Sequence, residues 1–354
     1  MNWEDNVRKV VPYVAGEQPK EQNVIKLNTN ECPYPPAPGV EEALHGFDCD
    51  ALRKYPDQDV SLLVHALAAR HGLSDRQVFA GVGSDDVLAM SFLTFFNSGK
   101  PVLFPDITYS FYDVWAELYR IPYQCQPLDD NFCIRKEDYF RENGGIIIAN
   151  PNAPVGVASP LSDLEEIIRA NPDSVVIIDE AYVDFGGESC VPLIKKYDNL
   201  LVVQTFSKSR SMAGMRIGYA MGNEKLIRYL NDVKFSFNSY TMSAVSIAAG
   251  AASVADETYF RDTVAKVVAT RERVKGELEK LGFSCTDSKT NFLFVSHGTI
   301  PAREIFEALR AEKIYVRFWD KPRISNCLRI SIGTDKEMDR VLAFLEDYTG
   351  ARKD

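Results

Sequence analysis

The fold of this chain is decided by two apolar stretches, which read SVVIIDEAY over residues 174–182 and LLVVQTFSK over residues 200–208. In both, consecutive apolar residues run directly into polar and charged ones. Continuous rather than alternating apolarity is typical of a strand that is buried on both faces, as in a parallel sheet covered by helices. Three more runs of this kind span residues 78–82, 101–104 and 145–149. Together the five runs predict the strands of one mostly parallel sheet.

Stretches with helical spacing lie between these runs. Apolar residues recur at intervals of three and four over residues 59–71, 85–96 and 111–118, which predicts three helices. Strands that alternate with helices are typical of an α/β domain whose sheet has helices on both faces. We therefore expect a large domain of this class over residues 40–255.

The chain beyond residue 255 has a different pattern. A long charged helix is predicted over residues 258–281, then a strand at 291–295, a helix at 301–312 and a strand at 328–332. This order is typical of a smaller α+β unit, which we expect to span residues 256–354.

The N-terminal segment contains crowded prolines at positions 33, 35, 36 and 38. Proline removes a backbone donor and disfavours the helical conformation of the residue before it, so this stretch is predicted to run extended over a surface. We expect residues 1–39 to join the small domain.

Composition excludes several classes of function. The 354 residues contain 40 Lys and Arg against 50 Asp and Glu, and the net charge of −10 disfavours binding to nucleic acid or to an anionic membrane. No apolar run approaches the roughly 20 residues of a membrane helix, and the N-terminus does not resemble a secretory signal. The seven cysteines are scattered without a C-x-x-C pair, and the four histidines show no metal-ligand spacing. These features predict a cytoplasmic enzyme with reduced thiols and no metal site.

Candidate chemistry collects where the predicted strands end, because ligands of open α/β sheets bind outside the carboxyl ends of the strands. Asp179 ends one buried run, and a partly desolvated carboxylate there requires a cationic partner. Lys208 follows the next run between two serines, a setting that suits Schiff-base chemistry. Arg216 stands between glycines in an apolar stretch and could grip an anion. Taken singly, each has a structural alternative: a helix N-cap or ion pair for Asp179, a solvated loop for Lys208, and a carboxylate of the protein for Arg216.

Three weaker signals are expected at the same edge. Gly83, Ser84 and Asp85 precede a predicted helix, whose N-terminus could cradle an anion, although Ser84 could equally be a plain N-cap. Residues 150–156 form a rigid turn with amide side chains, and Tyr109 offers an aromatic face unless it is a core residue. An amine, a buried carboxylate, an aromatic face, an anion cradle and an arginine are together what pyridoxal 5′-phosphate requires.

Several motifs add a resemblance to a known family. They are LNTNE at 27–31, RKYPD at 53–57, DEAY at 179–182, SKS at 207–209 and CLRISIG at 327–333. With these motifs the chain resembles, over nearly its whole length, the fold-type I, class II pyridoxal-phosphate-dependent aminotransferases, and within them the histidinol-phosphate aminotransferases. The DEAY and SKS motifs carry the resemblance to the superfamily. The Tyr-Pro-Asp motif at 55–57 and the Leu-Arg-Ile motif at 328–330 narrow the resemblance to the histidinol-phosphate type.

The resemblance implies roles toward the cofactor. Lys208 would bond the cofactor aldehyde and later carry a proton between Cα and C4′. Asp179 would pair with the pyridine nitrogen, Tyr182 would donate to the phenolic oxygen, and Tyr109 would stack on the ring. The phosphate would be held by the backbone amides of Ser84 and Asp85 and by Thr205, Ser207 and Arg216.

One position departs from the family pattern. The family usually has Asn-Asn-Pro-Thr-Gly, whose second asparagine bonds the phenolic oxygen, whereas this chain has Ala153 there and Val155 in place of the threonine. We expect Asn152, one residue earlier, to substitute; the alternative is that Tyr182 makes the contact alone.

The resemblance also implies substrates and partners. Arg329 and Arg317 would bind the substrate's anionic group, with Tyr13 and Asn30 nearby; for Arg317 the alternative is a strand residue paired with a surface acid. Tyr55 would reach the cofactor phosphate and substrate of a neighbouring subunit, which makes a homodimer with shared active sites. The reaction implied is transfer of the amino group of L-histidinol phosphate to 2-oxoglutarate, a step of histidine biosynthesis.

Other functions stay open on the same scaffold. The ring pocket could take the phenyl ring of an aromatic amino acid, and a threonine-phosphate decarboxylase shares these motifs. A ligand-sensing module that has kept the fold is the non-enzyme alternative. It is disfavoured because Lys208, Asp179, Tyr182 and Arg216 are all present and no DNA-binding segment is visible.

Overall fold

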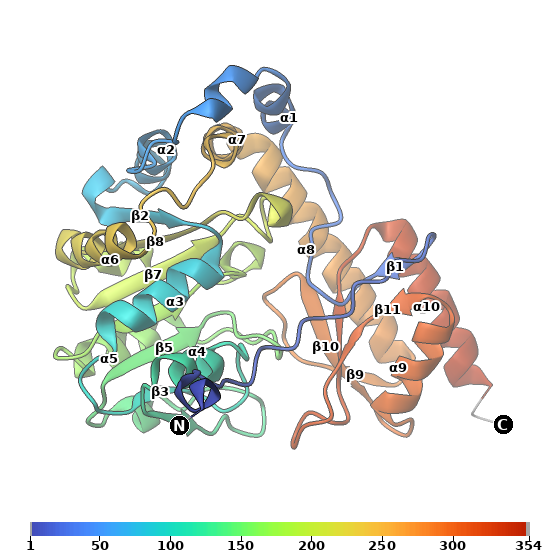
Figure 1. The fold of residues 1–354 in the computed structure, drawn as a ribbon. Coiled ribbons are helices and arrows are strands. Elements are labelled where there is room, and N and C mark those ends of the chain that lie inside the picture. Colours follow the sequence, from blue (N-terminus) through green and yellow to red (C-terminus); the bar gives the residue numbers. More distant parts are fainter. Residues whose placement is uncertain (1, 352–354) are drawn as a thin grey trace.

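The structure is a computed structural model that describes residues 2–351 (Figure 1). Runs of consecutive apolar residues form the larger of its β-sheets. Within that range its seven strands lie in the order β2-β8-β7-β6-β5-β3-β4. β8 runs antiparallel to both neighbours, and the other adjoining strands are parallel. The strands are β2 (Val78–Gly81), β3 (Val102–Pro105), β4 (Tyr123–Gln126), β5 (Gly145–Ala149), β6 (Val176–Asp179), β7 (Leu200–Thr205) and β8 (Gly218–Gly222).

Both faces of this sheet are buried. Successive residues of a strand point to opposite faces, so Val176 and Ile178 of β6 pack into one cluster of buried side chains while Ile177 packs into another. Because each face has its own helix layer, neither set of side chains is polar, which explains the unbroken apolar runs of the sequence.

All five predicted strands are present, and the prediction of a mostly parallel α/β sheet is confirmed. β6 begins two residues later and β7 ends two residues later than predicted. The sequence pattern missed β4 and β8. Three of the four residues of the edge strand β4 are exposed, so it has no apolar signal, and β8 begins and ends with glycine.

Helices cover the sheet in two layers. Buried residues of α1 (Pro38–His45), α2 (Ser61–His71), α5 (Leu161–Ala170) and α7 (Ala244–Ala255) pack on one face. Those of α3 (Ser84–Phe95), α4 (Tyr112–Tyr119) and α6 (Glu224–Phe237) pack on the other. The helices predicted over residues 59–71, 85–96 and 111–118 are confirmed as α2, α3 and α4.

A second half of the molecule follows α7 (Figure 1). Its antiparallel sheet has the order β12-β13-β10-β9 and packs with three helices around a core of its own. No helix within residues 2–351 has both the length and the apolarity to cross a membrane. The elements are α8 (Glu257–Lys280), β9 (Phe283–Cys285), β10 (Phe292–His297), α9 (Ala302–Ala311), β12 (Arg317–Phe318), β13 (Leu328–Ser331) and α10 (Asp335–Gly350).

The N-terminal segment crosses from one half to the other (Figure 1). Its strand β1 (Ile25–Lys26) pairs in parallel with β11 (Ile314–Tyr315) of the second half. The prediction of an extended path is wrong at two places. Trp3–Asn6 forms a 3₁₀ turn, and α1 begins at Pro38, because proline is tolerated at the first position of a helix, where no backbone donor is needed. The domain limits at residues 40 and 255 stay a prediction.

Candidate active site

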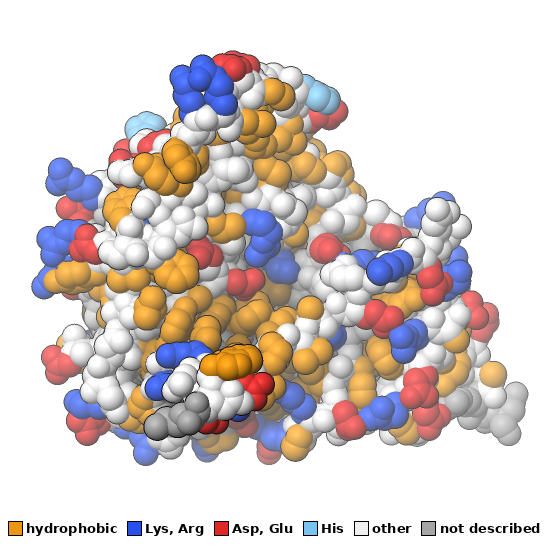
Figure 2. All heavy atoms as spheres, in the orientation of Figure 1, with side chains coloured by type: hydrophobic (Ala, Val, Ile, Leu, Met, Phe, Trp, Pro, Cys, Tyr) orange, Lys and Arg blue, Asp and Glu red, His pale blue; other side chains and the backbone are white. Residues whose placement is uncertain are grey.

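Two adjoining cavities lie at the carboxyl ends of the large sheet's parallel strands. The inner one has a volume of about 240 Å³ and the outer one about 390 Å³. Lys208, Tyr182, Tyr109, Ala153 and Thr29 line both, so the two spaces share a wall. Figure 2 shows a hollow between the two halves of the molecule, with apolar side chains over its floor and basic ones at its centre.

The inner cavity brings together most of the residues predicted to bind the cofactor. They come from the ends of β6 and β7, the start of α3, and the loops after β3 and β7. Parallel strands end at one edge of the sheet, which is why segments far apart in sequence meet here. The predicted residues that line this cavity are Ser84, Asp85, Tyr109, Asp179, Tyr182, Thr205, Ser207, Lys208 and Arg216.

Asp179 is a buried carboxylate at the end of β6. The Tyr112 hydroxyl donates to its Oδ2 at 2.8 Å, and the Ala181 amide donates to its Oδ1 at 3.2 Å. Burial raises the pKa of Asp179 to about 6, against the lowering effect of these two hydrogen bonds. Among residues 2–351 it takes part in no ion pair, so a cation entering the cavity would find an acceptor that is already oriented.

Lys208 and Tyr182 form the wall between the two cavities. The Lys208 ammonium donates to the Thr29 carbonyl at 3.1 Å and lies 5.8 Å from the centre of the Tyr182 ring. The Tyr182 hydroxyl accepts from the Asn30 side chain at 2.9 Å. Asn30 is itself fixed, because Ser331 donates to its side-chain oxygen at 2.8 Å. Within residues 2–351 the Lys208 amine is thus held by one backbone carbonyl, whereas the Tyr182 hydroxyl is oriented by a buried amide.

The other end of the inner cavity is built for an anion. It lies at the N-terminus of the twelve-residue helix α3, where the backbone N–H groups and the helix dipole favour negative charge. Glycine at 83 and 218 keeps this place open: a Cβ on Gly218 would lie 2.2 Å from the Ser84 nitrogen, and one on Gly83 would lie 2.6 Å from the Arg216 guanidinium. Arg216 contacts the Asp85 carboxylate at 3.5 Å, and the same carboxylate accepts from the Tyr109 hydroxyl at 2.8 Å.

These residues fit pyridoxal 5′-phosphate. The buried carboxylate of Asp179, which has no cationic partner in the described part of the chain, suits a protonated pyridine nitrogen, and the helix terminus beside Arg216 suits a phosphate. Lys208 supplies the amine for an aldehyde, and it lies on the wall toward the outer cavity.

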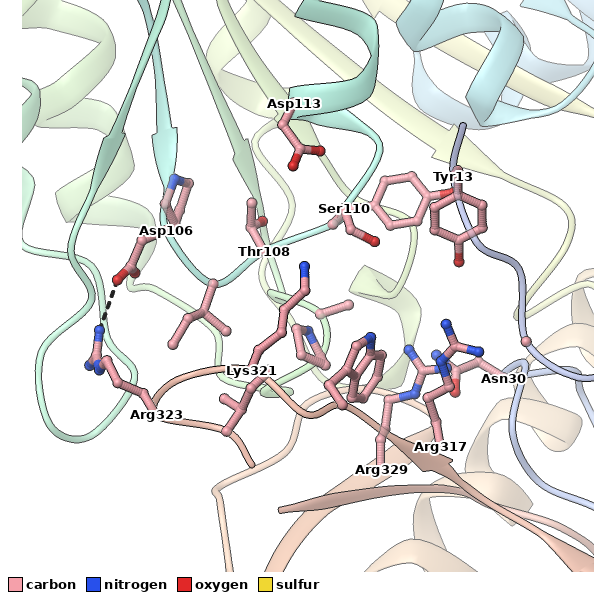
Figure 3. A pocket seen from close by; sticks show the side chains of 18 of the residues that line it. Tyr13, Asn30, Asp106, Thr108, Ser110, Asp113, Arg317, Lys321, Arg323 and Arg329 are labelled. Carbon is pink, nitrogen blue, oxygen red and sulfur yellow. Dashed lines mark hydrogen bonds and ion pairs between the residues drawn. The ribbon is translucent and has the colours of Figure 1, made fainter. Parts of the chain in front are cut away.

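The outer cavity contains two arginines that have no carboxylate partner among the described residues (Figure 3). Arg329 donates to the Asn28 carbonyl at 2.9 Å, while its buried Nε has no hydrogen-bond partner. Arg317 donates to the carbonyls of Val14 and Ala15 at 3.0 and 3.2 Å. A buried guanidinium donor without an acceptor is costly, so this pair favours an anionic ligand.

The N-terminal segment forms one wall of the outer cavity. The ring of Tyr13 stacks on that of Phe111, with 4.2 Å between ring centres, and lies 6.5 Å from Tyr109. The arginine contacts to Val14 and Ala15 hold the same segment from the other half. The predicted substrate residues Tyr13, Asn30, Arg317 and Arg329 therefore all line one cavity.

Two predicted residues lie outside both cavities. The Asn152 side chain accepts from the Thr108 hydroxyl at 2.8 Å and donates to the Ile107 carbonyl at 2.9 Å, so it orders the loop after β3, while Ala153 lines the cavities. Tyr55 is 82% exposed, with its ring stacked on Tyr240 at 4.7 Å between ring centres.

Sequence reasoning missed Tyr112, Trp319 and Lys321. Tyr112 is buried in α4 and reads as a core residue, although its hydroxyl holds Asp179. The Trp319 ring faces both site arginines, at 5.3 Å from Arg317 and 5.2 Å from Arg329. Lys321 follows in the same loop, and no motif marks it. The one available signal was the cluster of aromatic and basic residues after Arg317.

The chain is similar to proteins of a known family. Residues 22–345 match the model of the family "Aminotransferase class I and II". The chain is 56% identical over 348 residues to the histidinol-phosphate aminotransferase of Lactococcus lactis subsp. cremoris (strain MG1363), with 98% of each chain covered. It is 52% identical over 340 residues to that of Clostridium acetobutylicum, covering 96% of this chain and 97% of the relative. The crystal structure of histidinol-phosphate aminotransferase from Sinorhizobium meliloti in complex with pyridoxal-5′-phosphate matches with a TM-score of 0.87 at 25% identity over 96% of each chain.

Proposed function

Because this chain belongs to the class I and II aminotransferase family, we propose that it converts L-histidinol phosphate and 2-oxoglutarate into imidazole-acetol phosphate and L-glutamate. It is a pyridoxal-phosphate-dependent transaminase of fold type I. The observation that carries the choice of substrate is the pair Arg317 and Arg329, which line the outer cavity together with Lys208 and have no carboxylate partner among residues 2–351. A phosphate ester has more charge and more acceptor oxygens than a carboxylate, and two guanidinium groups suit it.

Lys208 is proposed as the group that moves protons. When bound, the cofactor supplies a covalent anchor for the amino group and an electron sink for the bond broken at Cα. Lys208 lines the wall that both cavities share, so its amine can reach a Cα–H bond of a substrate in the outer cavity. The Lys208 amine is held by a hydrogen bond to the Thr29 carbonyl. Breaking that bond would let the amine take the proton from Cα and return it at C4′.

The neighbouring groups hold charge and orientation. Asp179, oriented by Tyr112 and the Ala181 amide, is proposed to keep the pyridine nitrogen protonated. Tyr182, oriented by Asn30, is proposed to donate to the phenolic oxygen without the asparagine that the family has in place of Ala153. The Tyr13 segment forms one side of the outer cavity.

The first experiment is a titration of the cofactor-loaded protein, followed by the visible absorbance of the bound cofactor. L-Histidinol phosphate is expected to convert the absorbance at lower concentration than L-glutamate or L-phenylalanine. A response to aromatic amino acids but not to histidinol phosphate would favour an aromatic aminotransferase instead. Release of CO₂ from a phosphorylated amino acid would favour the decarboxylase.

Arg317→Ala is expected to raise the half-saturating concentration of histidinol phosphate by about 10- to 100-fold, because one of two phosphate ligands is lost. The value for L-glutamate should change by less than about threefold, since Arg329 alone suits a carboxylate. The same absorbance titration measures both. Arg228→Ala, which removes an exposed arginine outside the cavities, serves as the control. Equal losses for both substrates would contradict a phosphate ligand at Arg317.

A homodimer with shared active sites is part of the proposal. It is supported by the exposure of Tyr55, which lines neither cavity of its own chain although it belongs to a motif whose tyrosine is expected to bind cofactor. Lys208→Ala and Tyr55→Ala dimers, each of low activity, should regain about a quarter of wild-type activity after subunit exchange, because half of the dimers are then mixed and each mixed dimer carries one intact site out of two. No gain on mixing, with exchange shown by mass, would place both residues in the site of one chain.

The proposal includes the cytoplasm as the compartment. All seven cysteines are free in the structure, and unpaired thiols are the norm in a reducing environment.

A further inference from the structure

The outer cavity is lined by a lysine and an aspartate that have no role in the proposed reaction as described above. Lys321 lies in the loop between β12 and β13, and Asp113 lies in the first turn of α4, on the opposite half of the molecule. Both line the outer cavity, and Figure 3 shows the Lys321 ammonium and the Asp113 carboxylate pointing toward the same space. Neither takes part in an ion pair among residues 2–351.

Contacts of the neighbouring residues hold the backbone around Lys321, whereas its side chain takes part in no ion pair among the described residues. Two residues later, Arg323 makes an ion pair with Asp106 at 3.0 Å and donates to the carbonyls of Leu128 and Asp129 at 2.9 and 2.8 Å. The next residue, Ile324, is buried. The loop is thus anchored to the large half, and the long stem of Lys321 extends from it along the cavity.

One part of the outer cavity must accept chemically different side chains from the two substrates. Each must present its Cα–H bond to Lys208 with the same handedness, so corresponding substituents occupy the same parts of the cavity. The phosphate arm of histidinol phosphate then faces Arg317 and Arg329, and the α-carboxylate of glutamate, in the same place, faces Arg329. The remaining substituent is an imidazole ring in one substrate and a carboxylate in the other, and both must fit the end of the cavity away from the arginines.

Resting on the proposed function, we infer that Lys321 and Asp113 are alternative partners for these two side chains. Lys321 pairs with the distal carboxylate of glutamate and 2-oxoglutarate, and Asp113 accepts a hydrogen bond from the imidazole N–H of histidinol phosphate. A lysine suits this role because its long stem can approach a carboxylate or withdraw from a ring. The carboxylate of Asp113 would repel a second carboxylate unless the lysine came between them.

The test compares both amino donors on one protein by the absorbance of the bound cofactor. The measured quantity is the ratio of the half-saturating concentration of L-glutamate to that of L-histidinol phosphate. Lys321→Met should raise this ratio about tenfold, because the partner of the distal carboxylate is lost. Lys321→Arg, which keeps a long cation, should restore the ratio to within about threefold of wild type. Asp113→Asn should lower the ratio about tenfold, since glutamate is no longer repelled and the ring meets a weaker acceptor.

Matched controls come from the same kinds of side chain outside the cavity. Lys225→Met removes an exposed lysine on α6, and Glu117→Gln removes a carboxylate one turn beyond Asp113 on α4. Neither control should move the ratio by more than about twofold. A ratio that is unchanged in both Lys321→Met and Asp113→Asn overturns the inference. A wild-type protein that does not respond to histidinol phosphate overturns the proposed function instead, so the two failures are distinguishable.

Discussion

Lys208→Ala is expected to lower turnover with histidinol phosphate at least about 10³-fold, the largest effect of any single substitution in this chain. The substitution removes the amine that is proposed both to anchor the cofactor and to move the proton. Cofactor binding should persist, because the anion end of the inner cavity, with α3 and Arg216, is untouched. Steady-state turnover measures the first effect, and the cofactor retained after gel filtration measures the second.

Covalent attachment gives an independent readout of the same prediction. Borohydride reduction of the wild-type protein should fix the cofactor to the peptide that contains Lys208, and the mass of that peptide should rise accordingly. The alanine variant should show no labelled peptide. Lys225→Ala, at an exposed lysine on α6, is the control and should be labelled and active like wild type. Turnover that survives in Lys208→Ala would mean that another amine performs this chemistry.

Asp179→Asn is expected to lower turnover at least about 100-fold, because a neutral amide does not hold a proton on the pyridine nitrogen. The amide oxygen can still accept from the Ala181 amide, and the Tyr112 hydroxyl can accept from the new NH₂ group instead of donating, so the local structure should be kept. Turnover and the position of the cofactor absorbance band both report this change. Asp198→Asn, at an exposed aspartate, should leave both unchanged.

The same substitution should change how stability depends on pH in the cofactor-free protein. Burial raises the pKa of Asp179 from its ordinary 3.8 to about 6, so the folded state favours the protonated form. Stability that this group contributes is present below about pH 4 and is lost as the pH rises toward 6, by about 3 kcal/mol in all. Asp179→Asn removes that loss, so the variant should be more stable than wild type at pH 8 and similar to it at pH 4.

Thermal unfolding of both cofactor-free proteins across this pH range measures the effect. The comparison must be made between variant and wild type, because burial also raises the pKa of the neighbouring Glu180, to about 7, and both proteins share that dependence. A stability difference that does not vary between pH 4 and 8 would contradict an unpaired buried carboxylate at Asp179.

Much of the site could be predicted because its residues follow buried strands. Asp179, Lys208 and the start of α3 stand directly after apolar runs, and parallel strands bring such positions to one edge of the sheet. Nine of the predicted cofactor residues line the inner cavity for this reason. The side-chain contacts of Asn152 could not be predicted in this way. Its position in the turn was right, but its side chain is used by Thr108 and Ile107, which no spacing reveals.

The sequence by itself determined the layered α/β architecture and the edge at which the chemistry collects, because apolar periodicity and strand ends are local properties of the chain. Which side chains contact one another in the site was decided only by the tertiary structure. Tyr112 meets Asp179 across 67 positions of sequence, and Asn30 meets Tyr182 across 152. Lys321 and Asp113 come from opposite halves and share one cavity. Such contacts depend on how the two halves and the N-terminal segment pack together, and the free energy of that packing is spread over many residues rather than carried by a motif.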